Sequence, residues 1–176
     1  MDREQILRRA LGIAAVFNAG GAMLFAFPAN ALGEMAGLPA AVPDTANQVG
    51  WPQFVATMEG VVASLSPGER AHAVILANDY SEASPLLLLG AGLPPVYSGH
   101  NSYWSWGPPP DDRTVVIHVG DWRPDDWSDY FSDCRDVAQI DDGLGVDNAE
   151  QGKVITVCLG MHAPWSTIWP AMRTIS

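Results

Sequence analysis

The sequence predicts a small α/β domain, a two-layer or three-layer sandwich with a mixed, mainly parallel sheet, preceded by one apolar N-terminal helix. Short runs of apolar and β-branched residues alternate along the chain with segments whose apolar residues recur every three or four positions. Such alternation is typical of strands joined by helices. A run without charged side chains from Ala10 to Gly33 predicts the N-terminal helix.

The elements of the first half follow from apolar spacing. Residues 51–65 carry a helical stripe that the Ser66-Pro67-Gly68 step should end. Residues 72–77 (HAVILA) form a short apolar run of the kind found in buried strands. A helix is expected at residues 83–89, ended by Gly90, and a second short strand at residues 95–98.

The second half begins with the clearest strand, residues 114–120 (TVVIHVG), which is rich in β-branched residues. Pro124 predicts the start of a helix that runs through Phe131, because proline is tolerated in the first turn. Two strands, at residues 135–140 and 154–159, flank a loop. The last helix is expected at residues 164–173, where Trp165, Ile168, Trp169 and Met172 form a core-facing stripe.

The charge balance excludes one class of partner. Nine basic and twenty acidic residues give a net charge of −11, which repels phosphate backbones, so we expect no nucleic-acid binding. Three of the basic residues, Arg3, Arg8 and Arg9, precede the charge-free run. The first segment therefore differs in kind from the acidic remainder.

The first segment, residues 1–37, is interpreted as an export leader. It is either a signal anchor, which makes the protein single-pass with an extracytoplasmic C-terminal domain, or a signal peptide cleaved at Ala29-Asn30-Ala31, which leaves a secreted protein. The alternative is an ordinary buried helix. Residues 38–50 have linker composition, and residues 51–176 form the predicted extracytoplasmic domain.

Cys134 and Cys158 are the two cysteines of the chain. Cys134 lies just before one predicted strand and Cys158 within the next, and neighbouring strands can bring such positions within bridging distance. A disulfide suits an exported protein. Two buried, unpaired thiols in a cytosolic domain are the alternative.

Several phrases of the sequence occur in the same order in a known family. They are VILANDYSEAS at residues 74–84, LPPVYSGHNSYWSWGPPP at 93–110, IDDGLGVDNAEQG at 140–152, VCLG at 157–160 and APWSTIWP at 163–170. Over residues 51–176 the chain resembles the C-terminal extracytoplasmic domain of bacterial family 39 glycosyltransferases, which are related to protein O-mannosyltransferases and aminoarabinose transferases. The proline-rich aromatic phrase is the most specific of the five.

The resemblance implies a compartment and a fold, and it does not carry over an active site. In that family the catalytic acidic residues lie in a multi-span membrane region, which this chain lacks, so no catalytic residue is assigned and the question of an enzyme stays open. The resemblance implies a non-catalytic tail that binds or positions a glycan or a polyprenyl-phosphate sugar. Its partners would be the membrane, through the N-terminal helix, and a membrane glycosyltransferase. The alternatives are one part of a glycosyltransferase that acts with a separate membrane core, and a small extracytoplasmic enzyme that acts on glycans.

The candidate ligand-binding residues lie in two phrases. The step from Asn78 to Glu82 follows a predicted strand, and ligands of α/β sheets bind at that end of the strands. The loop after residue 98 offers flat rings for the apolar faces of sugars, and amide and imidazole groups for their hydroxyls. The candidates are Asn78, Asp79, Tyr80, Glu82, His100, Asn101, Tyr103, Trp104 and Trp106.

Each candidate also has a purely structural interpretation. Asp79 or Ser81 could cap a helix, and the rings could close the top of the core. The acidic loop from Asp141 to Glu150 departs from the calcium-loop spacing, and His118, within an apolar strand, is more typical of a core histidine than of a base. We therefore assign no metal ion and no cofactor.

Overall fold

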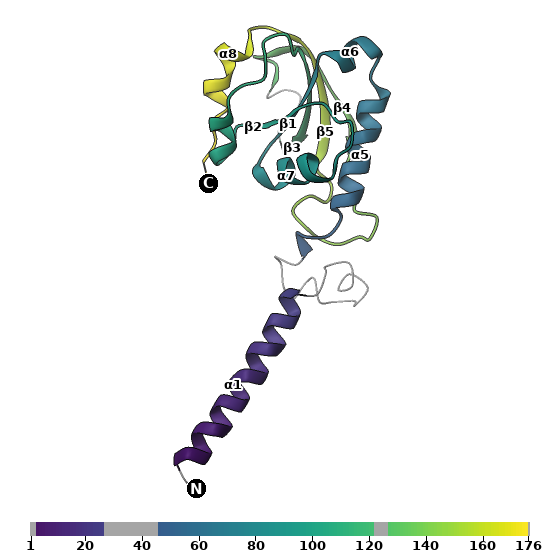
Figure 1. Cartoon of the computed structure of the whole chain (residues 1–176). Coiled ribbons are helices and arrows are strands. Elements are labelled where there is room, and N and C mark those ends of the chain that lie inside the picture. Colours follow the sequence, from purple (N-terminus) through teal and green to yellow (C-terminus); the bar gives the residue numbers. More distant parts are fainter. Residues whose placement is uncertain (1–2, 27–45, 122–126, 176) are drawn as a thin grey trace. The chain divides into compact units, whose positions relative to one another are not determined.

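The computed structural model describes residues 3–26, 46–121 and 127–175. The chain forms two compact units, one of Met1–Val49 with Val146–Asn148, and one of Gly50–Gly145 with Ala149–Ser176. The second unit carries all the strands, and it is the domain discussed below (Figure 1).

The first unit contains one long helix, α1 (Arg3–Ala26). Within the described residues, no helix combines the length and the apolar character needed to cross a bilayer. The predicted apolar spanning helix is therefore not found among the described residues. The remainder of the predicted leader, and most of the predicted linker, lie outside the described residues.

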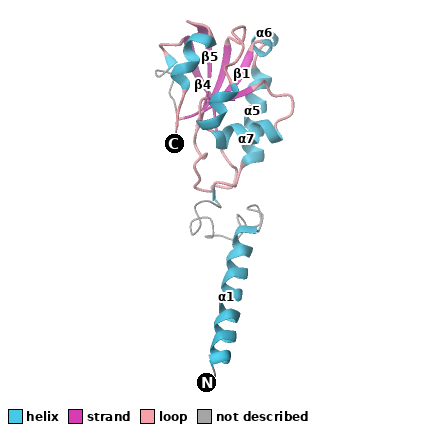
Figure 2. Ribbon diagram, turned by 60° about the vertical axis from the view of Figure 1, so that its left-hand side comes forward, coloured by secondary structure: helices cyan, strands magenta, loops and turns pink. Residues whose placement is uncertain are grey.

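The domain is built on a five-stranded sheet with the order β2-β1-β3-β5-β4. The strands are β1 (Ala73–Ala77), β2 (Val96–Ser98), β3 (Val115–Gly120), β4 (Phe131–Gln139) and β5 (Val154–Met161). Strand β1 lies between β2 and β3 and is parallel to both, whereas β5 is antiparallel to β3 and to β4. The α/β class and the mixed sheet are thus confirmed (Figure 2).

The expectation of a mainly parallel sheet is wrong. Two of its strand pairs are parallel and two are antiparallel, because β5 runs opposite to its neighbours and lies between β3 and β4. As a consequence, the carboxyl ends of β1, β2, β3 and β4 and the start of β5 share one edge of the sheet. We call this the carboxyl edge.

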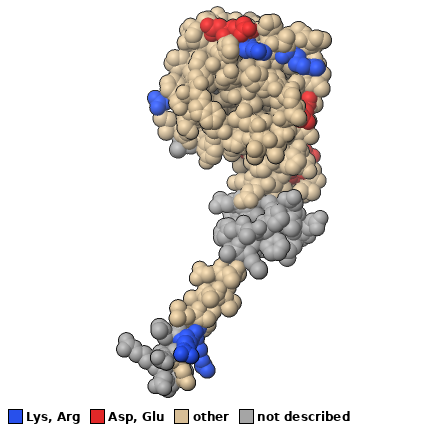
Figure 3. Space-filling view, in the orientation of Figure 1, with Lys and Arg blue, Asp and Glu red and all other residues tan. Residues whose placement is uncertain are grey.

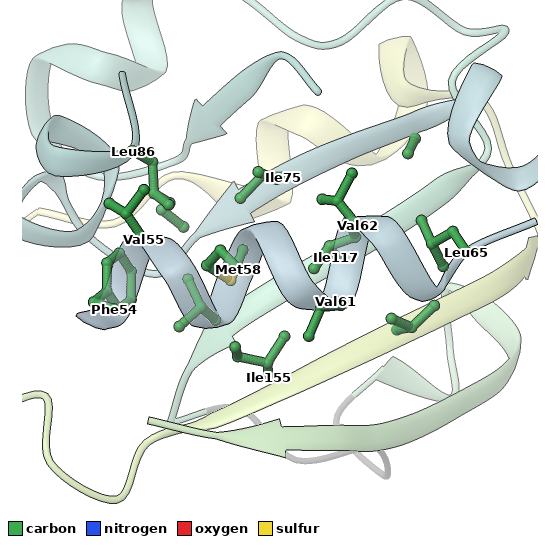
Figure 4. Close-up of a cluster of buried hydrophobic side chains, with 14 of the residues drawn as sticks. Phe54, Val55, Met58, Val61, Val62, Leu65, Ile75, Leu86, Ile117 and Ile155 are labelled. Atoms are coloured by element: carbon green, nitrogen blue, oxygen red, sulfur yellow. The ribbon is translucent and has the colours of Figure 1, made fainter. Parts of the chain in front are cut away.

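Residues of β1 alternate between two cores, as the two-residue period of a strand requires. Ala73, Ile75 and Ala77 face helices α5 (Trp51–Ser64) and α7 (Tyr80–Leu89). Figure 4 shows the apolar stripe of α5 lying on this face of the sheet, with Met58 pointing toward the strand residues. The stripe is the one that the spacing of residues 51–65 predicts.

The opposite face of the sheet is covered by aromatic residues. Val74 and Leu76 pack there with Trp127, Trp165 and Trp169, which come from the turn before β4 and from the C-terminal helices. Those helices are α8 (Trp165–Ile168) and the 3₁₀ helix η3 (Trp169–Met172). They divide the single helix expected at residues 164–173, because Pro170 cannot donate the next α-helical hydrogen bond.

Two further expectations differ from the structure. The part of the predicted helix at residues 124–131 that the structure describes is a turn, and Phe131 already belongs to β4, where it pairs with Met161. A short helix, α6 (Pro67–Ala71), begins where a stop was expected. Ser66 and Glu69 form a capping box at its start, so the predicted stop after α5 is also the beginning of α6.

Candidate functional site

The two candidate phrases meet at the carboxyl edge. The Asn78–Glu82 step follows β1 and opens α7, while the loop with the 3₁₀ helix η1 (Asn101–Trp106) follows β2, the strand beside β1. The hydroxyls of Ser84 on α7 and Tyr103 on η1 lie 3.0 Å apart and join the two segments. The two segments are distant along the chain, and the parallel pairing of β1 and β2 brings them together.

The start of α7 is a complete capping box. The Asp79 carboxylate accepts hydrogen bonds from the backbone N–H groups of Ser81 (2.7 Å) and Glu82 (3.3 Å). The Glu82 carboxylate in turn accepts from the N–H groups of Asn78 (2.7 Å) and Asp79 (3.3 Å). Burial alone would raise the pKa of Asp79, but the hydrogen bonds from Ser81 and the backbone outweigh it and lower that pKa. The structural interpretation of Asp79 as a helix cap is confirmed.

Glu82 also belongs to a buried ionic cluster. Its side chain is 0% exposed, and its second oxygen lies 2.8 Å from the ammonium of Lys153, which lies 3.2 Å from Glu150. Two carboxyl groups therefore compete for one ammonium in a medium that solvates charge poorly. Burial raises the pKa of Glu82 to about 8 and also raises the pKa of Glu150. Burial opposes ionisation of Lys153 as well, but the Glu82 carboxylate more than offsets this and raises the lysine pKa.

Sequence reasoning missed Lys153 and Glu150 as members of this cluster. The signal available for Lys153 is that it is the only lysine of the chain, placed directly before an apolar strand. A long basic side chain at such a position has a buried carboxylate as a natural partner. The pairing with Glu82, 71 residues away, depends on the insertion of β5 beside β3 and could not be predicted from spacing.

The aromatic candidates form a surface on the loop side. The rings of Tyr80 and His100 are stacked with centroids 5.3 Å apart and planes at 5°. Tyr103 and Trp106 are neighbours at 4.2 Å. Tyr80 is 50% exposed and Trp106 is 68% exposed, whereas His100 is buried beneath. The exposed ring surfaces are those that could contact a ligand.

Trp104 and Asn101 hold the loop in place. The indole N–H of Trp104 donates to the carbonyl of Trp169 (3.2 Å), and the indole of Trp169 donates back to the carbonyl of Trp104 (3.3 Å). The Arg173 guanidinium lies 4.7 Å from the centre of the Trp104 ring. Asn101 adopts a left-handed φ of 51°, and its N–H donates to the carbonyl of Thr174 (2.9 Å). These contacts hold the loop in place. The rings of Tyr80 and Trp106 are more exposed than that of Trp104.

His118 is a core histidine, as its apolar strand suggested. It is 2% exposed, its Nδ1 lies 2.9 Å from the carbonyl oxygen of Leu76, and burial lowers its pKa to about 4. With Asn78 and Trp127 it lines a cavity of about 20 Å³. Such a volume holds about one water molecule and no sugar ring. A sugar beside these residues would therefore lie outside this cavity.

Gly120 fixes the end of β3 beside this cavity. Its φ is +140°, and a Cβ there would lie 2.4 Å from Cβ of Asn78. No side chain fits at that separation, so glycine allows β1 and β3 to end side by side. The position of Asn78 depends on this close approach.

The predicted disulfide is confirmed. Cys134 on β4 and Cys158 on β5 are directly opposite each other in the ladder and form a disulfide, and no cysteine of the chain is free. The bridge closes the loop that contains residues 140–153. In the chain-entropy model this closure contributes about 3 kcal/mol to the free energy of unfolding. It lies away from the carboxyl edge, in the β4–β5 pair.

Asp142 illustrates what the acidic loop does. Its carboxylate accepts from the N–H groups of Leu144 (2.7 Å) and Gly145 (2.8 Å), which closes a tight turn. Among the described residues, no group of three or more His, Cys, Asp or Glu side chains is arranged to hold a metal ion.

The chain was compared with protein-family models, curated proteins and solved structures, and none gave a significant match.

Proposed function

We propose that the domain is a non-catalytic, exported module that binds a glycan or a lipid-linked sugar at the carboxyl edge. The sugar would lie on the exposed rings of Tyr80 and Trp106, which we call the ring surface. The observation that carries the proposal is the exposed pair of rings, Tyr80 and Trp106, held on two adjoining elements beside polar loop residues. Flat aromatic faces of this kind contact the C–H faces of sugars, and neighbouring hydroxyl and amide groups complement sugar hydroxyls.

The carboxylates support a binding role over a catalytic one. An enzyme that acts on glycans needs a carboxyl group that can reach the glycosidic bond. Glu82 is 0% exposed and bound to Lys153, and the Asp79 carboxylate is occupied by the cap of α7. A small glycan-active enzyme that uses these two residues with His100 therefore gains no support from their geometry.

Export is part of the same proposal. The disulfide in the domain suits an oxidising compartment, and the basic, charge-poor first segment suits an export leader. Whether the leader is an anchor or is cleaved affects the location of the protein and not the sugar surface. The resemblance to the tail of family 39 glycosyltransferases points the same way, toward a domain that works beside a separate membrane-embedded core.

The experiment titrates the full chain with mannobiose and with mannose linked to a short-chain isoprenoid phosphate, and follows tryptophan fluorescence and heat. We expect saturable binding that Trp106→Ala weakens by roughly tenfold, the equivalent of about 1.4 kcal/mol for one ring contact. Trp106→Phe keeps a ring and should retain most of the affinity. Equal affinity of the protein and Trp106→Ala for both probes, or no binding of either, would contradict the proposed surface.

A further inference from the structure

The segment around the ring surface is unusual in its charge. From Ala83 to Pro110 the sequence contains no Asp, Glu, Lys or Arg, although the chain has twenty acidic and nine basic residues. Most of α7 and the whole of η1 fall in this segment. Residues 83–110 of these two elements therefore contribute no fixed charge to a surface that they share.

The two elements form one continuous surface. Tyr80, Ser84, Leu87 and Leu88 are spaced as one face of a helix requires, and the contacts of Ser84 with Tyr103 and of Tyr103 with Trp106 extend that face onto η1. Leu88 is 84% exposed, so apolar side chains project from it. We call these six residues the uncharged face. Figure 3 shows one side of the domain with the charged residues only around its margin.

We propose that the uncharged face docks onto the interfacial region of a lipid bilayer made of zwitterionic lipids. Trp and Tyr favour the depth of the lipid headgroups, and leucine favours the hydrocarbon below them. Moving a leucine or aromatic side chain out of water is favourable. The six side chains of the face carry no charge, so moving them into this region desolvates no ion of their own.

The area of the face argues against a second copy of the chain as the occupant. Six partly exposed side chains present on the order of 500 Å². A stable protein–protein interface buries about 800 Å² on each partner. A bilayer needs no matching protein surface and takes up a few projecting side chains.

The net charge specifies the kind of lipid. A protein of −11 is repelled by an anionic membrane, and its uncharged face offers nothing to offset that repulsion. Docking should therefore be strongest on phosphatidylcholine, and phosphatidylglycerol should weaken it at low salt. Most peripheral proteins with basic surfaces show the opposite dependence.

This inference goes beyond sugar binding and does not depend on it, because Leu87 and Leu88 lie outside the sugar candidates. If both hold, the domain would bind a glycan at the membrane surface, where a lipid-linked sugar is presented.

The experiment places an environment-sensitive fluorophore on the face of the full-length protein. Because both native cysteines are in the disulfide, a single introduced cysteine is the only thiol to label. Leu88→Cys carries the probe on the face. Val137→Cys, on β4 at the far edge of the sheet from β2, carries it on the matched control. Both are mixed with phosphatidylcholine vesicles, with and without phosphatidylglycerol.

We expect the emission of the probe at residue 88 to shift to shorter wavelength with phosphatidylcholine vesicles while the probe at residue 137 stays unchanged. Leu88→Gln in the unlabelled protein should lower the vesicle partition coefficient by roughly tenfold. Vesicle binding with no shift at residue 88, as attachment through α1 alone would give, overturns the proposal. A shift without vesicles that grows with protein concentration also overturns it, in favour of self-association.

Discussion

The two sides of α7 differ from those of an ordinary surface helix in where the charged residue and several of the leucines lie. Its only charged residue, Glu82, faces inward and is fully buried, together with Ala83 and Leu86. Its outward side carries Tyr80 and Leu88, which are largely exposed. Surface helices normally place charges outward and leucines inward. The inward side is explained by partners within the chain, whereas the leucines of the outward side are exposed to solvent.

The difference shows that charged and uncharged residues have separate roles at the carboxyl edge. Charged groups there stabilise the fold: Asp79 caps α7, and Glu82 joins α7 to the start of β5 through Lys153. Uncharged rings and leucines form the exposed surface of α7 and η1. Substitutions on the inward side should therefore change stability, and substitutions on the outward side should change binding.

Removal of the Lys153 ammonium tests the inward side most severely. Above pH 8, where Glu82 is ionised in the folded protein, Lys153→Met leaves it buried without its cation, and we expect the free energy of unfolding to fall by about 3–5 kcal/mol. Urea unfolding followed by circular dichroism measures the loss.

The double variant Glu82→Gln/Lys153→Met is the matched control. It removes both charges, so it should recover much of the stability lost in Lys153→Met. A double variant no more stable than the single one would mean that Lys153 acts through packing of its stem and not through Glu82.

The burial of the Glu82 carboxyl group predicts a pH dependence of stability. The pKa of Glu82 is about 8 in the folded protein and ordinary in the unfolded chain, so the folded state holds a proton that the unfolded state has released. This contribution to stability is complete below the unfolded pKa and is lost as the pH rises through about 8. Between about pH 6.5 and 9 we expect the free energy of unfolding to fall by about 1–2 kcal/mol.

Glu150→Gln should flatten this profile in part, because it removes the second raised carboxyl pKa and the repulsion that Glu150 exerts on Glu82, whereas the burial of Glu82 remains. His118 does not interfere: its pKa is lowered to about 4 by burial, so its contribution is lost only as the pH falls below about 6.5. Chemical unfolding of both proteins at several pH values provides the measurement. Parallel profiles for the two would refute competition within the cluster.

Local signals predicted much of this molecule. The stripe of α5, the apolar runs of β1 and β3 and the cap at Asp79 each depend on residues close in sequence, so they could be predicted. The Cys134–Cys158 pair was accessible because it required only that two neighbouring strands form a hairpin. The position of β5 between β3 and β4 depends on long-range pairing, and the parallel-sheet expectation and the missed Lys153 cluster both follow from that.

The ring surface shows the same limit at the candidate site. The residue types of the His100–Trp106 loop identified it as a place for flat rings. Their division into exposed Trp106 and supporting Trp104 depends on the contact of Trp104 with Trp169, 65 residues away. A proline-rich loop has no periodicity from which to predict such orientation, so sequence alone weights all its rings equally.

The smallest expected effect tests whether the outward side of α7 is free of partners within the chain. Leu88→Ala should change the free energy of unfolding by less than about 0.5 kcal/mol, because a side chain that is 84% exposed loses little packing. Leu86→Ala, two residues earlier in the same helix and 1% exposed, should cost about 2–5 kcal/mol. A loss above about 1 kcal/mol for Leu88→Ala would place the leucine in an intramolecular contact. Because lipid can insert only around a side chain that is accessible in the free protein, that result would remove the physical basis for membrane docking while leaving the buried cluster intact.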